Sequence, residues 1–203
     1  MNICIYGGAS TEISSKYVEA VEELSLKLAL RGHDLVFGAG EGGVMGAAAR
    51  GFHKGGGKVM GVAPDFFTNG TIEDLYENCD ALVKTDSMGV RKTVMESNAD
   101  AFITAPGGIG TYDEFFQILT LKQLKVFDKP IVLFNVAHYY DAFGTQLKVG
   151  MEENFLRIDT PVLCRVFDET EIDAVVEYLE SYDHDYTRAT GTDVETDYGE
   201  KDE

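Results

Sequence analysis

The chain alternates between short, continuous apolar runs and longer stretches in which apolar residues recur every three or four positions. The runs at residues 3–6 and 101–105 hold few polar side chains, which is typical of strands covered on both faces of a parallel sheet. Residues 16–31 show the helical spacing instead, and Gly32 follows them as a stop signal.

Over the whole chain this pattern predicts a single α/β domain with a doubly wound parallel sheet of about seven strands. We expect strands at residues 3–6, 35–37, 58–63, 81–84, 101–105, 131–135 and 162–167. We expect helices at residues 16–31, 44–54, 88–98, 111–124, 140–154 and 169–181. Ligands of such sheets bind beyond the carboxyl ends of the strands, so the loops that follow strands are the candidate sites.

Residues 183–203 differ in composition from the rest, with eight acidic residues against two basic ones and few apolar side chains. Such a composition is typical of a solvated, disordered segment. We therefore expect a ligand-binding domain over residues 1–182 and a disordered acidic tail over 183–203. An interaction arm is the alternative for the tail.

The protein as a whole is acidic, with 17 basic residues, 35 acidic residues and a formal net charge of −18. This charge argues against a nucleic acid or an anionic membrane as partner. No apolar run reaches the roughly 18–20 residues of a membrane span, and the first residues lack the pattern of a signal peptide. Cys4, Cys79 and Cys164 are too far apart for zinc spacing and too few for a disulfide framework. We expect a cytoplasmic protein with no metal site.

Glycine clusters follow three predicted strands, at Gly7-Gly8, at 38–46 and at 107–110. Each alone could be a tight turn, but together they form a rim at one edge of the sheet. The sequence APGGIGT at 105–111 lies between a strand and a helix, where unpaired N–H groups and the helix dipole favour an anion. Thr111 adds a hydroxyl. We therefore predict a phosphate site, which is not a Walker A loop because no Gly-Lys-Ser/Thr follows.

A second glycine loop, GAGEGG at 38–43, formally matches the dinucleotide pattern G-x-G-x-x-G, and Asp65 follows about twenty residues later. The match is weak because the loop follows the second predicted strand rather than the first. A nicotinamide-dependent dehydrogenase is therefore disfavoured.

Two charged residues stand beside these loops. Arg91 lies near the start of a predicted helix, where a positive charge opposes the helix dipole. It is either solvated, paired with Asp86 or Glu96, or turned towards an anionic ligand, which its planar fork suits. Glu114 stands three residues after Thr111, which is the spacing of a capping box. It either caps the helix or also reaches the sugar attached to a bound phosphate.

Three motifs together resemble those of the Lonely Guy family: GGVMG at 42–46, MGVRK at 88–92 and PGGIGTYDE at 106–114. The likeness runs from Ile3 to about Asn154 and includes DKP at 128–130 and Asn135 with Tyr139-Tyr140. Members of this family are nucleoside 5'-monophosphate phosphoribohydrolases that release cytokinin bases, and they are often mislabelled lysine decarboxylases.

The resemblance implies a Rossmann-like homodimer without metal or organic cofactor, in which Arg91 and Glu114 form the catalytic pair. It also implies that the glycine rim and the three motifs bind the substrate, through Gly8, Gly43, Met45, Met88, Lys92, Pro106, Gly107, Gly108, Gly110 and Thr111. The sequence departs from the family at Gly89 and Leu121, where relatives usually carry His and Trp.

Three functions compete for this site. A phosphoribohydrolase would release a free base and ribose 5-phosphate from a small-molecule nucleoside monophosphate, and the sequence leaves the base open. A lysine decarboxylase would need a Schiff-base lysine for pyridoxal phosphate, and Lys92 is the only lysine near the site. A non-catalytic carrier of a phosphorylated ligand, such as the related molybdenum-cofactor carriers, would use the glycine loops without Glu114. The intact R-K element at 91–92 and T-x-x-E element at 111–114 favour the phosphoribohydrolase.

The predicted helix at 111–124 bears on assembly, because it is apolar nearly all round. Such a helix must be buried on more than one side. The sheet covers one side, and we expect a second copy of the chain to cover the other. The helix at 169–181 is the alternative cover.

Overall fold

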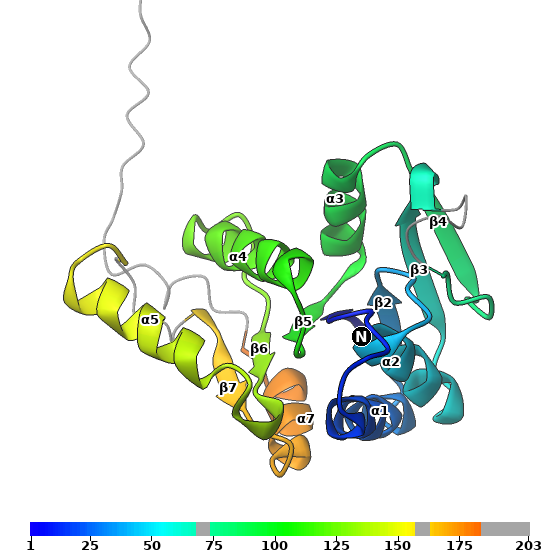
Figure 1. Ribbon diagram of the computed structural model, residues 1–203, viewed down its shortest axis with the longest axis horizontal. Helices are drawn as coiled ribbons and strands as arrows, with labels where there is room; N and C mark the ends of the chain where they lie inside the picture. The colour runs from blue at the N-terminus through cyan, green and yellow to red at the C-terminus, as the bar shows by residue number, and fades with distance from the viewer. Residues whose placement is uncertain (68–73, 157–162, 184–203) are drawn as a thin grey trace, which may run out of the picture.

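The computed structural model describes residues 1–67, 74–156 and 163–183, which form one parallel sheet with helices on both faces (Figure 1). The strands are β1 Asn2–Tyr6, β2 Asp34–Phe37, β3 Val59–Pro64, β4 Ala81–Thr85, β5 Ala101–Thr104, β6 Ile131–Phe134 and β7 Arg165–Phe167. The helices are α1 Ser15–Leu30, α2 Gly43–Lys54, α3 Met88–Asn98, α4 Ile109–Gln123, α5 Asp141–Glu152 and α7 Ile172–Glu180. Two 3-10 turns, η1 Asp65–Phe67 and η2 Val136–His138, complete the order. The predicted doubly wound, Rossmann-like fold is confirmed.

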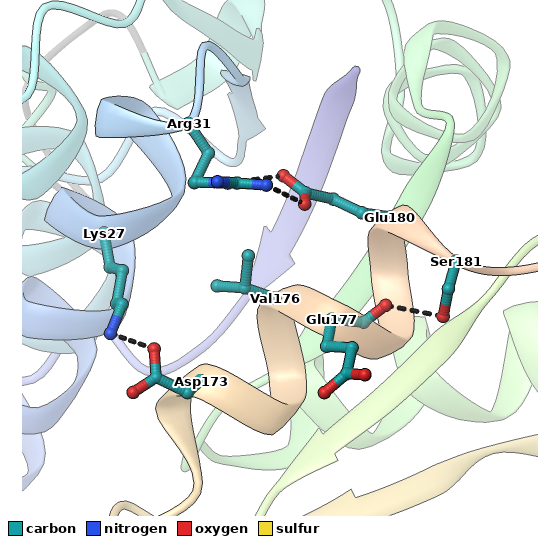
Figure 2. A pocket seen from close by; sticks show the side chains of 7 residues that line it. All are labelled: Lys27, Arg31, Asp173, Val176, Glu177, Glu180 and Ser181. Atoms are coloured by element: carbon teal, nitrogen blue, oxygen red, sulfur yellow. Dashed lines mark hydrogen bonds and ion pairs between the residues drawn. The ribbon is translucent and has the colours of Figure 1, made fainter.

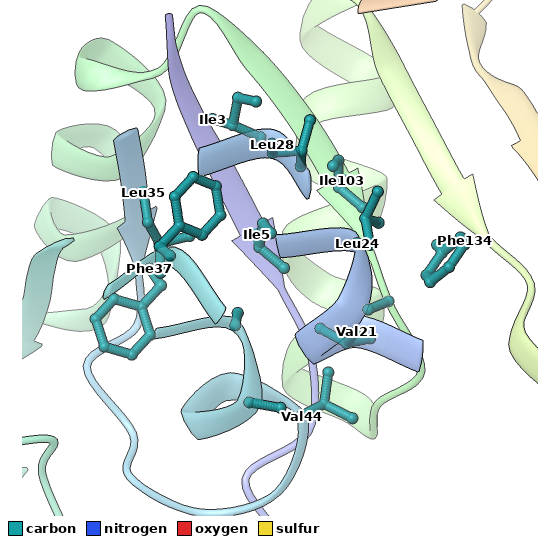
Figure 3. Packing of buried hydrophobic residues seen from close by; sticks show 14 of the residues in the cluster. Ile3, Ile5, Val21, Leu24, Leu28, Leu35, Phe37, Val44, Ile103 and Phe134 are labelled. Atoms are coloured by element: carbon teal, nitrogen blue, oxygen red, sulfur yellow. The ribbon is translucent and has the colours of Figure 1, made fainter. Parts of the chain in front are cut away.

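Successive residues of each strand point to opposite faces, and this alternation divides the core in two. Ile3 and Ile5 of β1 belong to a cluster with buried residues of α1, α2 and α7. The close view of this cluster shows them together with Leu24 and Leu28 of α1 and Val44 of α2 (Figure 3). Cys4 and Tyr6 belong to the second cluster, which contains residues of α3 and α4 and the start of α5. Both faces of the central strands are therefore covered, which explains why β5 and β6 read as continuous apolar runs.

The strand order is β4-β3-β2-β1-β5-β6-β7, so the chain builds the sheet outward from β1 in one direction and then returns to its other side. The reversal falls between β1 and β5, where Tyr6 pairs with Thr104. The loops after these two strands therefore leave the sheet side by side. This switch point is where doubly wound folds bind ligands.

The structure changes two sequence predictions about the C-terminal part of the chain. The last strand begins at Arg165, and the earlier part of its expected range includes residue 162, which lies outside the described residues. Helix α7 begins at Ile172, and its buried residues pack on the α1 face of the sheet. It therefore does not cover α4, which lies on the opposite face, and that alternative is wrong. The predicted tail lies outside the described residues beyond Asp183.

In the part of the chain that the structure describes, no helix has both the length and the apolar character needed to cross a bilayer. The same described residues contain no group of three or more His, Cys, Asp and Glu side chains placed to hold a metal ion.

Candidate active site

The glycine clusters that the sequence separates meet at the switch point. The N–H of Gly8 donates to the carbonyl of Pro106 at 3.0 Å, which joins the loop after β1 to the loop after β5. The carbonyl of Gly8 accepts from the N–H groups of Val44 and Met45 at 2.8 and 3.2 Å, which joins the same loop to the start of α2. Gly43 has φ +52°, and a Cβ there would lie 2.7 Å from the Gly8 oxygen. These glycines are therefore needed for the close approach of three backbone segments.

Only one of the two glycine-rich helix starts is open to a ligand. The first turn of α2 is closed, because Gly8 takes the N–H groups that would otherwise face an anion. The cap residue of α4 is Gly108, which has no side chain to bond the first turn. Among the atoms of the described residues, none lies within 4 Å of a Cβ built on Gly108 or Gly110. The open first turn of α4 is thus the place where unpaired N–H groups remain for a phosphate.

Helix α4 begins at Ile109, two residues earlier than the sequence predicted. Thr111 is therefore the third residue of the helix rather than its cap, and Glu114 lies in the second turn. The capping box proposed for these two residues is wrong. Glu114 has a different partner.

That partner is Arg91, whose side chain is only 6% exposed. Its Nη1 donates to Glu114 Oε1 at 3.1 Å, its Nε to the carbonyl of Val62 at 3.0 Å, and its Nη2 to the carbonyl of Gly38 at 3.1 Å. The alternatives of a solvated arginine or a surface ion pair are therefore wrong. The planar fork is held from three sides, which fixes the position of the carboxylate that it touches.

Burial raises the pKa of Glu114 to about 7, and the neighbouring Asp113 adds to the rise. The Arg91 guanidinium acts in the opposite direction, because it favours the ionised carboxylate. Glu114 is 8% exposed. It is therefore a buried carboxyl group that can gain or lose a proton near neutral pH, which is a property of catalytic acids and bases.

Three other predicted site residues lie on α2 and α3. Lys92 Nζ donates to both oxygens of Asp113, at 3.0 and 2.8 Å, in a pair next to Arg91–Glu114 in sequence. Met45 is 8% exposed, and its Sδ would lie 3.1 Å from a Cβ on Gly38. Met88 opens α3 and is 37% exposed. Met45 Sδ and Arg91 Nη2 thus both lie against Gly38, whereas Met88 is at the surface.

No sequence pattern predicted two of the oxygens that accept hydrogen bonds from the Arg91 guanidinium. The Val62 carbonyl belongs to the backbone of β3, and no pattern of side chains predicts its hydrogen bond to Arg91. The Gly38 carbonyl comes from a loop that the sequence did single out, but for a dinucleotide rather than for an arginine. A residue that acts through its backbone carries no signal in its side-chain type.

A hollow of about 400 Å³ lies away from the glycine loops, between the C-terminal half of α1 and helix α7 (Figure 2). Ion pairs span it: Arg31 binds Glu180 through two nitrogens, and Lys27 contacts Asp173. None of the glycine-rim residues lines it. We interpret it as the seam that joins the last helix to the first.

Fold and site together define a Rossmann-like protein with an anion-binding turn and a buried Arg–Glu pair at its switch point. A family model described as "Possible lysine decarboxylase" matches residues 45–178. The chain is 38% identical over 160 residues to a probable cytokinin riboside 5'-monophosphate phosphoribohydrolase, LOG6 of Arabidopsis thaliana, covering 76% of each chain. It is 33% identical to LOG7 of the same plant, over 93% of this chain and 85% of the relative.

The chain therefore belongs to the Lonely Guy family, as its motifs predicted. Among solved structures, the molybdenum cofactor carrier protein of Chlamydomonas reinhardtii superposes with a TM-score of 0.65 at 22% identity, over 89% of this chain and 98% of the carrier. A cofactor-binding protein of Rippkaea orientalis gives 0.62 at 17% identity, over 89% of this chain and 96% of the other. These two similarities support the fold.

The residues at the site do not fit the decarboxylase description of the family model. Pyridoxal phosphate chemistry needs a lysine amine free to form a Schiff base. The ammonium of Lys92 is held by both oxygens of Asp113 instead.

Proposed function

We propose that this protein hydrolyses the N-glycosidic bond of a nucleoside 5'-monophosphate to give a free base and ribose 5-phosphate. The observation that carries the proposal is the buried Arg91–Glu114 pair, one helical turn into the helix whose open first turn suits a phosphate. The curated relatives with this activity are 33–38% identical, which supports the reaction class and leaves the base open.

The reaction builds positive charge on the ribose as the bond to the base breaks, as in glycoside hydrolysis. The ionised carboxylate of Glu114 would stabilise this charge and accept a proton from the attacking water. One hydrogen of the water then goes to Glu114, and the remaining hydroxyl goes to the ribose carbon. The electron pair of the broken bond goes to the departing base, which takes up a proton from solvent, and Glu114 returns its own proton to solvent. A carboxyl group with a pKa of about 7 is matched to such a base at neutral pH.

Arg91 has a supporting role in this proposal. Its three donated bonds go to protein oxygens, so it holds Glu114 and favours the ionised form. The substrate phosphate would bind at the first turn of α4, through the N–H groups around Gly108 and Gly110 and the hydroxyl of Thr111.

The direct test is incubation of the purified protein with a panel of nucleoside 5'-monophosphates that includes AMP and a cytokinin riboside monophosphate. We expect free base and ribose 5-phosphate in equal amounts. Tight binding of a monophosphate without release of base would favour the carrier function instead. Release from a nucleoside without phosphate at the same rate would contradict the assigned phosphate turn.

A further inference from the structure

Two adjacent tyrosines hold the turn that precedes α4. The hydroxyl of Tyr140 donates to the carbonyl of Ala105 at 2.8 Å, and the hydroxyl of Tyr139 donates to the carbonyl of Gly107 at 2.7 Å. The carbonyl between them, on Pro106, accepts from the N–H of Gly8. Three successive carbonyls of the turn are therefore bonded to the protein.

The hydrogen bonds to these carbonyls also fix the direction of the neighbouring N–H groups. A trans peptide is planar, and its C=O and N–H point in opposite directions. A hydrogen bond from Tyr139 to the Gly107 carbonyl therefore turns the N–H of Gly108 away from Tyr139. Since Gly108 has no Cβ and open space around it, its peptide would otherwise be among the freest to rotate.

The segment that carries the tyrosines is itself tightly held. Ala137 and His138 have φ of +50° and +62°, a left-handed conformation that non-glycine residues rarely adopt. The N–H of Ala137 donates to Glu169, and the N–H of Tyr140 donates to the side-chain oxygen of Asn135 at 2.7 Å. Strained backbone persists only where its surroundings impose it, and it occurs often at ligand sites.

The Tyr139 hydroxyl is well suited to donate a hydrogen bond. Its ring lies edge-on to that of Tyr17 at 5.8 Å. Burial raises the pKa of Tyr139 above its ordinary value, and Tyr112 adds to the rise, so the hydroxyl keeps its proton at neutral pH.

We propose that Tyr139 is a positioning residue for phosphate binding: its hydrogen bond to the Gly107 carbonyl presets the Gly108 N–H for the phosphate of the substrate. The inference rests on the proposed function for the identity of the ligand. It extends that function because it assigns the rigidity of the glycine turn to a side chain outside the turn, on the segment after β6.

The experiment compares the wild-type protein with Tyr139→Phe, which removes only the hydroxyl. Calorimetry measures binding of ribose 5-phosphate and of AMP, and a separate assay measures release of adenine. We expect both ligands to bind about three- to tenfold more weakly, the range of one hydrogen bond. We expect KM to rise by a similar factor while kcat stays within about twofold, since the bond acts equally in ground and transition states.

Tyr17→Phe is the matched control, because it removes a hydroxyl from the neighbouring ring. Among the described residues, the Tyr17 hydroxyl makes no hydrogen bond to the glycine turn. We expect this variant to bind ribose 5-phosphate as the wild type does. Unchanged binding in Tyr139→Phe, or equal weakening in both variants, would overturn the inference.

Binding also separates this inference from the proposed function. If wild-type protein binds ribose 5-phosphate, releases no base from any monophosphate, and loses affinity in Tyr139→Phe, the positioning role stands and the hydrolase proposal fails. If wild-type protein binds neither ribose 5-phosphate nor AMP at millimolar concentration, the positioning role is refuted.

Discussion

Gly38 and Arg91 share a space that only a glycine leaves open. The Gly38 carbonyl accepts a hydrogen bond from Arg91 Nη2 at 3.1 Å, and a Cβ on Gly38 would overlap with that same nitrogen. The loop after β2 and the helix α3 thus depend on each other. The position of Glu114, on a third element, depends on both.

The first prediction follows from this overlap. Gly38→Ala should displace the guanidinium and destabilise the fold by about 1–3 kcal/mol, the usual range for an overpacked core. Because Glu114 then loses the hydrogen bond from Arg91 that positions it, the rate of base release should fall as well. Melting curves and turnover measure the two effects.

Gly144→Ala is the control for this change, since a Cβ there meets no atom of the described residues within 4 Å and the residue lies inside α5. We expect it to be stabilising by about 0.4–1 kcal/mol through the unfolded chain, with turnover unchanged. Wild-type stability in Gly38→Ala would mean that the Arg91 guanidinium can move without destabilising the fold.

A second prediction concerns the charge on Glu114. Glu114→Gln keeps the shape and an oxygen acceptor for Arg91 but removes the carboxylate. Losing a preorganised contact of this kind should lower turnover about 10²–10³-fold. Since Glu114 does not cap its helix, no compensating role in the first turn complicates the result.

Asp113→Asn is the matched control, because Asp113 is the adjacent carboxylate, with a side chain 57% exposed and paired with Lys92. An exposed pair contributes little, about 0–1 kcal/mol, so this variant should turn over substrate nearly as the wild type does. Equal losses in the two variants would indicate a general electrostatic effect rather than a role for Glu114.

The third prediction is a pH dependence. The folded pKa of Glu114 is raised to about 7 from an ordinary value of 4.5, so between these values the folded state holds a proton that the unfolded state releases. The contribution of Glu114 to stability is therefore present below pH 4.5 and is lost as the pH rises through 7. Glu114→Gln should remove this part of the dependence, which melting curves between pH 4.5 and 7.5 would reveal.

The activity should change with pH in the opposite sense. If the ionised carboxylate acts, kcat rises as the pH increases towards about 7 and levels off above it. The residual activity of Glu114→Gln should lack this limb. A rate that falls as the pH increases through 7 would show that the protonated form acts instead.

The fourth prediction is assembly. Helix α4 is buried by the sheet through Phe115 and Ile118, yet Ile109, Phe116 and Leu124 remain 87%, 45% and 67% exposed. We propose that a second copy of the chain covers this face, so light scattering should give about twice 22.3 kDa. Phe116→Glu should shift the mass towards the monomer, whereas Leu30→Glu, on the opposite face of the sheet, should not.

The sequence predicted the elements well because their signals are local. Short apolar runs, several of them continuous, marked the strands of the sheet, and glycines marked the loops at the switch point. Element ends were less accurate, as at α4 and β7. Helix α4 begins earlier than predicted because Gly108 adopts the extended conformation of the cap residue. The capping-box pattern does not select a glycine at this position.

The sequence by itself determined the α/β fold, the family and the residue types at the site, because periodicity and short motifs lie within neighbouring positions of the chain. Only the tertiary structure decided what those residues do to one another. It showed that the Arg91 guanidinium is buried and bonded to three protein oxygens, replaced the helix-capping role of Glu114 by a partnership across two helices, and closed one glycine loop while leaving the other open. Each outcome depends on contacts between segments tens of residues apart, and the sheet order that creates them is not written in any local pattern.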